Sequence, residues 1–166
     1  MNPMKRTDAG RLQRPLIGAV IVALLVALVW MRLDQPDLPT MRIATPGGGI
    51  EVEITDRPAA RSAGLANRDA LNKIDGLLLK WDAPGRHPIW MAGMRFPLDL
   101  VWIDSSGRVI AVLSNVPPCH AEPCPLLEPD GSERSAAVLE PPAGEAARRG
   151  LTVGAILQIQ NESHRK

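Results

Sequence analysis

The sequence predicts a mainly β fold: a compact barrel- or sandwich-like domain with two short helices, preceded by one transmembrane helix. Three observations support this prediction. Two strand-like runs lie within the stretch from Trp90 to Leu113, joined by a turn sequence. The chain carries sixteen Pro and fourteen Gly, which favour short strands and tight loops over long helices. A run without charge extends from Leu16 to Met31, near the N-terminus.

The central stretch predicts a β-hairpin with strands at residues 98–103 and 108–113. Asp104 and the serines after it favour a turn, and Gly107 can take the positive φ that a bulged hairpin loop needs. Leu98, Leu100 and Trp102 alternate with Asp99 and two β-branched residues, so apolar side chains point to both faces. The second strand shows the same strict alternation. We therefore expect this hairpin in the middle of a barrel or sandwich, covered on both sides.

The other elements are predicted from alternation, helix signals and breakers. Asp56 is the expected N-cap of the first helix, and Gly150 is expected to end the second. The predicted elements are a first hairpin (41–44 and 50–54) with one face in solvent, a helix (58–66), a buried strand within 73–80, a loop (81–87), a short strand (88–91), an irregular segment (115–135), a strand (136–140), a helix (142–149) and a closing strand (153–160).

The N-terminal residues predict a signal anchor. The uncharged run from Leu16 to Met31 spans about 25 Å as a helix, at the short end of a membrane span and also compatible with a signal-peptide core. Trp30, Met31 and Arg32 stand where a small-residue cleavage site is needed, which favours an uncleaved anchor. The chain thus divides into a cytoplasmic basic segment (1–14), the helix (15–32), a linker (33–40), the β domain (41–160) and a tail (161–166).

Charge predicts the orientation of this anchor. Four basic residues precede the run, namely Lys5, Arg6, Arg11 and Arg14, whereas Arg32 alone follows closely. The positive-inside rule then places the N-terminus in the cytoplasm. We expect a single-pass protein of the inner (cytoplasmic) membrane whose C-terminal domain is periplasmic or otherwise extracytoplasmic.

Charge also limits the partners of the domain. Residues 41–160 hold twelve Lys and Arg against fourteen Asp and Glu, a net of −2. Nothing in this balance favours nucleic acid as a partner or adhesion of the domain itself to an anionic bilayer.

Several ordered motifs resemble those of one protein family. They are the Arg-x-x-Gly-Leu-x-x-Arg pattern of residues 61–68, the glycine-led strand 75–79, Trp90-Met91 with Pro97-Leu98-Asp99, the proline–cysteine loop 115–125, and the pattern of residues 139–154. Together they are similar to the family known as domain of unknown function 192 (DUF192, also UPF0127). The resemblance implies a mainly β fold and no established activity. It also shows a departure, because Ala92, Gly93 and Met94 stand where the family commonly has a polar run.

The two cysteines, Cys119 and Cys124, have three interpretations. Outside the cytoplasm a disulfide is the default, and it is our prediction. The alternatives are a metal site that adds His120 and His87 to the two thiolates, and a redox-active pair. A redox role is the least favoured, since the two-residue spacing of thioredoxin-like motifs is absent.

A binding pocket is predicted around Trp90 and Met91. Asp99 lies among apolar neighbours, so it must be hydrogen-bonded, paired or protonated. It is a candidate acid or base in a pocket beside Trp90, although a structural Asp that accepts backbone N–H bonds or pairs with an Arg is the favoured interpretation. A copper site through methionine thioethers is possible in principle, but Met is more often core filler.

Arg61 and Arg68 are candidates for binding an anionic ligand. They are seven residues apart and would share a helix face if the helix continues that far. The favoured alternative is a solvated face or pairing with Glu51, Glu53 or Asp99.

The sequence holds no complete catalytic constellation. It therefore predicts a ligand-binding or envelope-accessory module without cofactor or metal, whose small-molecule or protein partner it does not identify. The first alternative is a hydrolase-like enzyme that uses Asp99 near Trp90. The second is a metal-handling protein that uses Cys119, His120 and Cys124.

Overall fold

The computed structural model describes residues 18, 20–26 and 38–159. The chain divides into two compact units, Met1–Asp37 and Leu38–Lys166. In the first unit, residues 18 and 20–26 are helical. Within the described ranges no helix is both long and apolar enough to cross a membrane. Most of the predicted span from Leu16 to Met31, the basic segment 1–14 and the tail 161–166 lie outside the described residues.

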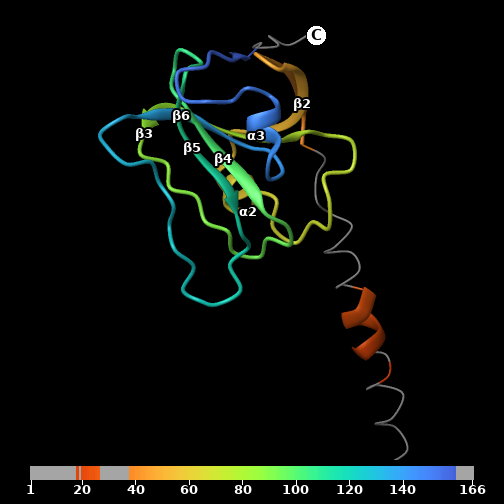
Figure 1. The fold of residues 1–166 in the computed structure, drawn as a ribbon. Coiled ribbons are helices and arrows are strands. Elements are labelled where there is room, and N and C mark those ends of the chain that lie inside the picture. Colours follow the sequence, from red (N-terminus) through yellow and green to blue (C-terminus); the bar gives the residue numbers. More distant parts are fainter. Residues whose placement is uncertain (1–17, 19, 27–37, 160–166) are drawn as a thin grey trace, which may run out of the picture. The chain divides into compact units, whose positions relative to one another are not determined.

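The second unit contains a sheet of seven strands in the order β5-β4-β6-β3-β2-β1-β7 (Figure 1). Neighbouring strands are antiparallel except β2 and β3, which are parallel. The strands are β1 (Thr40–Thr45), β2 (Gly48–Thr55), β3 (Gly76–Gly85), β4 (Leu98–Ile103), β5 (Val109–Val116), β6 (Ser135–Glu140) and β7 (Gln158–Ile159), with short helices α2 (Pro58–Ala63) and α3 (Glu145–Arg148). The predicted mainly β fold with two short helices is confirmed.

The sheet curls into a half-barrel, and the two edge strands are bridged by a short segment. The chain at 154–157 runs beside the start of β5 and then continues into β7. Three backbone bonds of 2.8 Å join this segment to β5, from Val109 N to Ala155 O, from Gly154 N to Val109 O and from Leu157 N to Gly107 O. All six residues of β4 are buried, as predicted. The central place of the whole hairpin was a wrong prediction, because β5 is an edge strand whose outer side is covered by this segment.

Alternation along β3, β4 and β6 divides the core into two clusters. The first core contains apolar residues from β1 to β6 and from the C-terminal segment, so it fills the inside of the curled sheet. The second core lies on the other face, where residues 65–96 cover the sheet. Examples are Val101 and Leu139 in the first core and Leu98, Leu100 and Trp102 in the second. The predicted faces of residues 98–103 are confirmed.

Two bulges interrupt the predicted alternation on β5. Trp102 pairs with Ala111 but Ile103 pairs with Val109, so one residue of β5 is extra. A second shift occurs near Asn115, whose φ is +55°. Strict alternation was therefore wrong for this strand, because a bulge turns the residues after it toward the opposite face.

The turn between β4 and β5 is as predicted. Asp104 Oδ1 accepts the backbone N–H of Ser106 at 2.8 Å and that of Arg108 at 3.0 Å. Gly107 has φ +85°, and a Cβ there would lie 2.5 Å from Leu157 O. Only glycine fits, since both the dihedral angle and the close backbone approach exclude a side chain.

Several element boundaries differ from the prediction. α2 ends at Ala63, where Gly64 takes φ +50°, and its N-cap is Arg57 rather than Asp56. β3 continues to Gly85 through the predicted loop, because its end pairs with Ser135 across a bulge. The predicted strands at 88–91 and 153–160 are reduced to isolated bridges and to the short β7.

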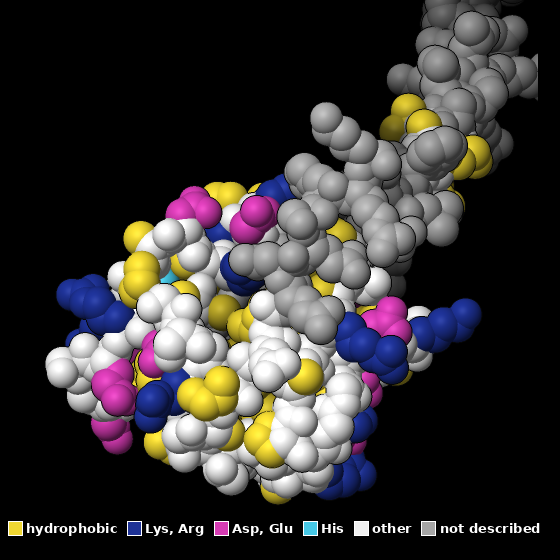
Figure 2. Space-filling view, turned by 90° about the horizontal axis from the view of Figure 1, so that it is seen from above, with side chains coloured by type: hydrophobic (Ala, Val, Ile, Leu, Met, Phe, Trp, Pro, Cys, Tyr) yellow, Lys and Arg dark blue, Asp and Glu magenta, His cyan; other side chains and the backbone are white. Residues whose placement is uncertain are grey.

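Charged side chains do not separate by sign on the face shown in Figure 2. Lys and Arg side chains are interspersed there with Asp and Glu side chains. This face therefore carries no large patch of a single sign.

Candidate functional site

A pocket of about 330 Å³ opens on the face of the sheet that carries the second core. α2, the end of β3, the segment 88–94, the loop after β5 and the end of β6 contribute to it. Most of its lining is apolar, and Arg61, Ser62 and Glu140 add polar groups. The lining residues are Pro58, Arg61, Ser62, Ala63, Gly64, Leu65, Leu79, Trp81, Pro88, Ile89, Trp90, Ala92, Met94, Leu98, Leu126 and Glu140.

The walls differ in exposure. Trp90 and Leu126 are 49% and 64% exposed, respectively, so they lie at the mouth. Leu79 and Leu98 are 2% and 1% exposed and form the floor. An apolar cleft with a few polar groups is the usual form of a small-molecule site.

Glu140 is the carboxyl group of this pocket. It is the last residue of β6 and only 4% exposed. The alternation of β6 places it on the same face as Val138 of the second core. Among the residues that the structure describes, no hydrogen bond or ion pair to its side chain is found. Burial raises the pKa of Glu140 to about 8, so the group is predominantly protonated at neutral pH and can both donate and accept a hydrogen bond.

Arg61 is the cation of the pocket. Its Nη1 donates to Lys80 O at 3.0 Å and also to Asp56 O, which fixes the side chain beside β3. Its Cζ lies 5.1 Å from the centre of the Trp81 ring, within cation–π range. None of the described carboxylates forms an ion pair with it. The guanidinium is therefore held in place while part of its hydrogen-bonding capacity remains for a ligand.

His87 supports this wall from behind. Its ring stacks on Trp81, with centroids 4.0 Å apart and planes 8° apart. Burial lowers the pKa of His87 although Nε2 donates to Ala83 O, and the nearby Arg61 lowers it further. The neutral imidazole thus stabilises Trp81 without adding charge to the pocket.

The structure brings together two of the five predicted pocket residues. Arg61 and Trp90 line the pocket, whereas Met91 is buried in the second core. Arg68 instead forms a 2.7 Å ion pair with Glu53, the alternative we had favoured. The shared helix face for Arg61 and Arg68 was wrong, because α2 ends at Ala63.

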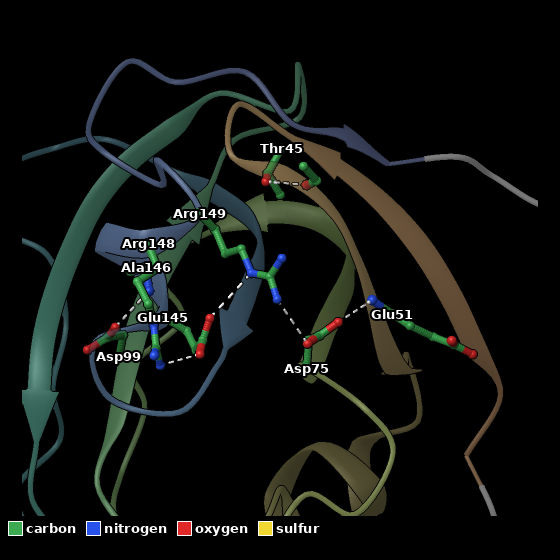
Figure 3. A network of polar contacts seen from close by, with 9 residues as sticks. Thr45, Glu51, Asp75, Asp99, Glu145, Ala146, Arg148 and Arg149 are labelled. Carbon is green, nitrogen blue, oxygen red and sulfur yellow. Dashed lines mark hydrogen bonds and ion pairs between the residues drawn. The ribbon is translucent and has the colours of Figure 1, made fainter.

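Asp99 lies on the opposite face of β4 from the pocket. Its Oδ1 accepts the N–H of Asn115 at 2.8 Å. Its Oδ2 accepts the N–H of Ala146 at 2.9 Å, as Figure 3 shows. The first bond captures the N–H that the β5 bulge removes from the ladder, and the second fixes the start of α3. Asp99 is thus a structural carboxylate, and its placement in a pocket with Trp90 was wrong.

Asp99→Ala tests this structural role. We expect a loss of roughly 2–4 kcal/mol of unfolding free energy, because the buried N–H of Ala146 loses its acceptor while that of exposed Asn115 can turn to water. Chemical denaturation measures it, with exposed Asp130→Ala as the matched control. A loss of ligand binding without a loss of stability would contradict the assignment.

A second polar network ties the C-terminal part to β2 and β3. Arg149 bonds to Glu145 and Asp75, each at 3.3 Å, and Asp75 accepts the N–H of Glu51 at 2.8 Å (Figure 3). None of these residues lines the pocket. The network therefore stabilises the sheet and does not contribute to the pocket.

Cys119 and Cys124 form a disulfide, as predicted. The bond occupies both sulfurs, so the alternative thiolate metal site with His120 is not present. Elsewhere in the described part of the chain, no three His, Cys, Asp or Glu side chains gather as a ligand set.

The disulfide loop is bound to the segment that carries Trp90. Ile89 and Leu127 exchange backbone bonds of 2.8 and 2.7 Å, and Cys119 N donates to Met91 O at 3.0 Å. These contacts place Leu126 of the loop at the mouth of the pocket. The loop between β5 and β6 is thus one wall of the site.

The double variant Cys119→Ser/Cys124→Ser tests how far the disulfide stabilises this wall. We expect a modest loss of stability, about 2 kcal/mol or less, because the disulfide closes a short loop stiffened by four prolines. Limited proteolysis should show faster cutting within residues 115–135 while the sheet stays protected. Intact mass after alkylation without reduction checks the bond itself, and two added alkyl groups in the parent would contradict it.

Sequence reasoning missed Glu140 and Trp81. The signal for Glu140 was present, since Val138 and Glu140 share one face of a strand that was predicted correctly. A carboxyl at the end of a buried strand indicates either an internal partner or a cavity. Trp81 was predicted to lie in a loop, because the predicted strand ends at residue 80 whereas β3 continues to Gly85.

Comparisons with known proteins agree with this fold. A crystal structure of a protein of unknown function from Novosphingobium aromaticivorans DSM 12444 has a TM-score of 0.65 and 24% identity, covering 75% of this chain and 89% of that one. A putative transcription regulator from Sinorhizobium meliloti 1021 has a TM-score of 0.62 and 29% identity, covering 71% and 90%. Among curated proteins, none is similar enough to count as a match. The model of the DUF192 family, described as Uncharacterized ACR, matches residues 41–159, and the chain belongs to this family.

Proposed function

We propose that this protein is a small-molecule-binding module held at the outer face of the cytoplasmic membrane. The observation that carries the proposal is Glu140, a 4% exposed carboxyl group that lines an apolar pocket without a partner in the described structure. A carboxyl group at this depth is poorly solvated, so a partner that hydrogen-bonds to it would stabilise it. A bound ligand can be that partner, because the group lines the pocket.

The contrast with Asp99 supports this interpretation. Both carboxyl groups are buried on β strands, at 0% and 4% exposure. Asp99 accepts two backbone N–H groups, whereas Glu140 faces the pocket. The fold therefore satisfies its structural carboxylate internally and leaves the pocket carboxyl available.

A pocket-blocking variant tests ligand binding. Ala63 lines the pocket at the end of α2, and Ala59 is exposed on the same helix but does not line it. We expect fragments with an aromatic ring to show saturation-transfer NMR signals with the full chain and with Ala59→Trp, but not with Ala63→Trp. Fragments that bind all three proteins alike, or none at all, would contradict the proposed function.

The uncharged run from Leu16 to Met31 and the basic residues before it support the membrane location. A periplasm-active reporter fused after Lys166 should be active, while the same reporter fused after Arg14 should be inactive. The full chain should stay in the membrane fraction after a carbonate wash. A soluble form that begins near residues 32–37 would show a cleaved signal peptide instead.

Nucleic acid is not part of the proposal. The similar protein from Sinorhizobium meliloti 1021 is a putative transcription regulator. Here residues 41–160 carry a net charge of −2, and proteins that bind nucleic acids rely on basic surfaces.

A hydrolase-like enzyme is a second candidate, with Glu140 as the acid in place of Asp99. A carboxyl group whose pKa is raised to about 8 is suited to donate a proton near neutral pH. Glu140→Gln would then abolish turnover and leave ligand affinity in place, whereas a binding module has no turnover to lose.

A further inference from the structure

Building on the proposed binding function, we infer that the pocket takes a small amphipathic carboxylic acid. Its carboxylate pairs with Arg61, and its apolar body lies between Trp90 and the floor of the pocket. Its far end carries a neutral hydrogen-bonding group, such as a hydroxyl, that meets Glu140.

The anionic end follows from the state of Arg61. Nη1 is anchored on the carbonyls of Lys80 and Asp56, both neutral acceptors, so the positive charge is not compensated by an ion pair in the described structure. A positioned guanidinium beside apolar walls is a typical carboxylate receptor, because its N–H groups match the two oxygens.

The length of the ligand follows from the sheet register. Arg61 is bonded to Lys80 O, and Lys80 lies three residues after Leu77 on β3. Leu77 is the direct strand partner of Glu140. At about 3.3 Å per residue along a strand and about 4.8 Å between strands, the backbone positions of Lys80 and Glu140 are about 11 Å apart. An aromatic ring with a chain of three carbons before its carboxylate has about this length.

The charge of the pocket determines whether an anionic or a cationic ligand is favoured. Among the residues that the structure describes, Arg61 and Glu140 are the ionisable ones that line the pocket. Burial keeps Glu140 largely neutral below about pH 8, which leaves the positive charge of Arg61 unopposed. Anions are therefore favoured over cations at neutral pH, and the preference weakens as Glu140 ionises.

The test uses three probes with one skeleton and different heads: 4-phenylbutyrate, 4-phenylbutan-1-ol and 4-phenylbutylamine. Calorimetric titration into the full chain in detergent, with detergent alone as blank, should show about tenfold or greater preference for the carboxylate over both others, the size expected for a charge-assisted bond. A hydroxyl in the para position of 4-phenylbutyrate should strengthen binding further by about threefold or more, as expected for one hydrogen bond.

Variants assign the two ends. Arg61→Gln should reduce the affinity for the carboxylate to that for the alcohol, and Arg61→Lys should restore part of it. Exposed Arg57→Gln, at the N-cap of the same helix, should change nothing. Glu140→Leu should abolish the gain from the para hydroxyl, and Glu140→Gln should keep it. Thermal melting of each variant checks that the pocket is still folded.

The outcomes separate this inference from the proposed function. Equal binding of the three heads, tighter binding of the amine, or a carboxylate preference that survives in a folded Arg61→Gln protein would overturn the ligand class while the pocket still binds small molecules. Failure of all these probes, together with the absence of any fragment excluded by Ala63→Trp, would overturn the proposed function as well.

Discussion

The free energy of unfolding is expected to fall as the pH rises from about 4.5 to about 8, by on the order of 4–5 kcal/mol, through Glu140 alone. Burial raises the pKa of this group from 4.5 to about 8 in the folded protein, and the unfolded chain has the ordinary value. Between these two values the folded protein holds one proton more than the unfolded chain. The stabilisation is therefore complete below the unfolded pKa and is lost as the pH passes through the folded pKa.

Chemical denaturation at a series of pH values measures this effect. Glu140→Gln removes it, so the difference in stability between parent and variant should change across this window and be constant outside it. Exposed Glu133→Gln is the matched control and should follow the parent. The difference also cancels the opposite contribution of His87, whose lowered pKa makes stability rise with pH. Parallel curves for parent and Glu140→Gln would show that Glu140 ionises as an ordinary carboxyl group.

Trp102→Ala is expected to cost about 3–5 kcal/mol of unfolding free energy, enough to unfold many domains of this size. Trp102 is 0% exposed in the second core, and its Nε1 donates to His87 O at 3.0 Å. The substitution thus leaves a large cavity beneath the pocket and an unpaired carbonyl. Loss of this support should also loosen His87 and the Trp81 ring stacked on it.

Two further tryptophan variants control this prediction. Trp90→Ala should change the melting temperature little, because Trp90 is 49% exposed. Trp102→Phe keeps most of the packing and should cost less than Trp102→Ala. A Trp102→Ala protein that melts within a degree or two of the parent would contradict the register of β4.

Local chemistry made much of the fold predictable. The run from Leu98 to Ile103 is apolar on both faces, and all six residues are buried. Asp104 and Gly107 specify the turn through bonds within a few residues. The disulfide follows from two cysteines close together and the compartment that the N-terminal residues predict.

The misassigned features depend on contacts between distant parts of the chain. β5 is an edge strand because the chain at 154–157 covers its outer side, and no local pattern shows this. The pairing of Arg68 with Glu53 and the use of Asp99 as an acceptor for Ala146 are likewise long-range. Trp90 was correctly predicted to line the pocket. The carboxyl group of the pocket comes from β6, 50 residues later in the chain.

Binding of small amphipathic molecules in this pocket can be tested with the indole signals of the four tryptophans. Trp81 and Trp90 line the pocket, whereas Trp102 is buried beneath it. In a ¹⁵N NMR titration of the full chain with 4-phenylbutyrate, the indole N–H signals of Trp81 and Trp90 should shift in a saturable way while that of Trp102 moves little. Assignment follows from single Trp→Phe variants. Saturation with Trp81 and Trp90 unmoved would place the ligand elsewhere and contradict the account.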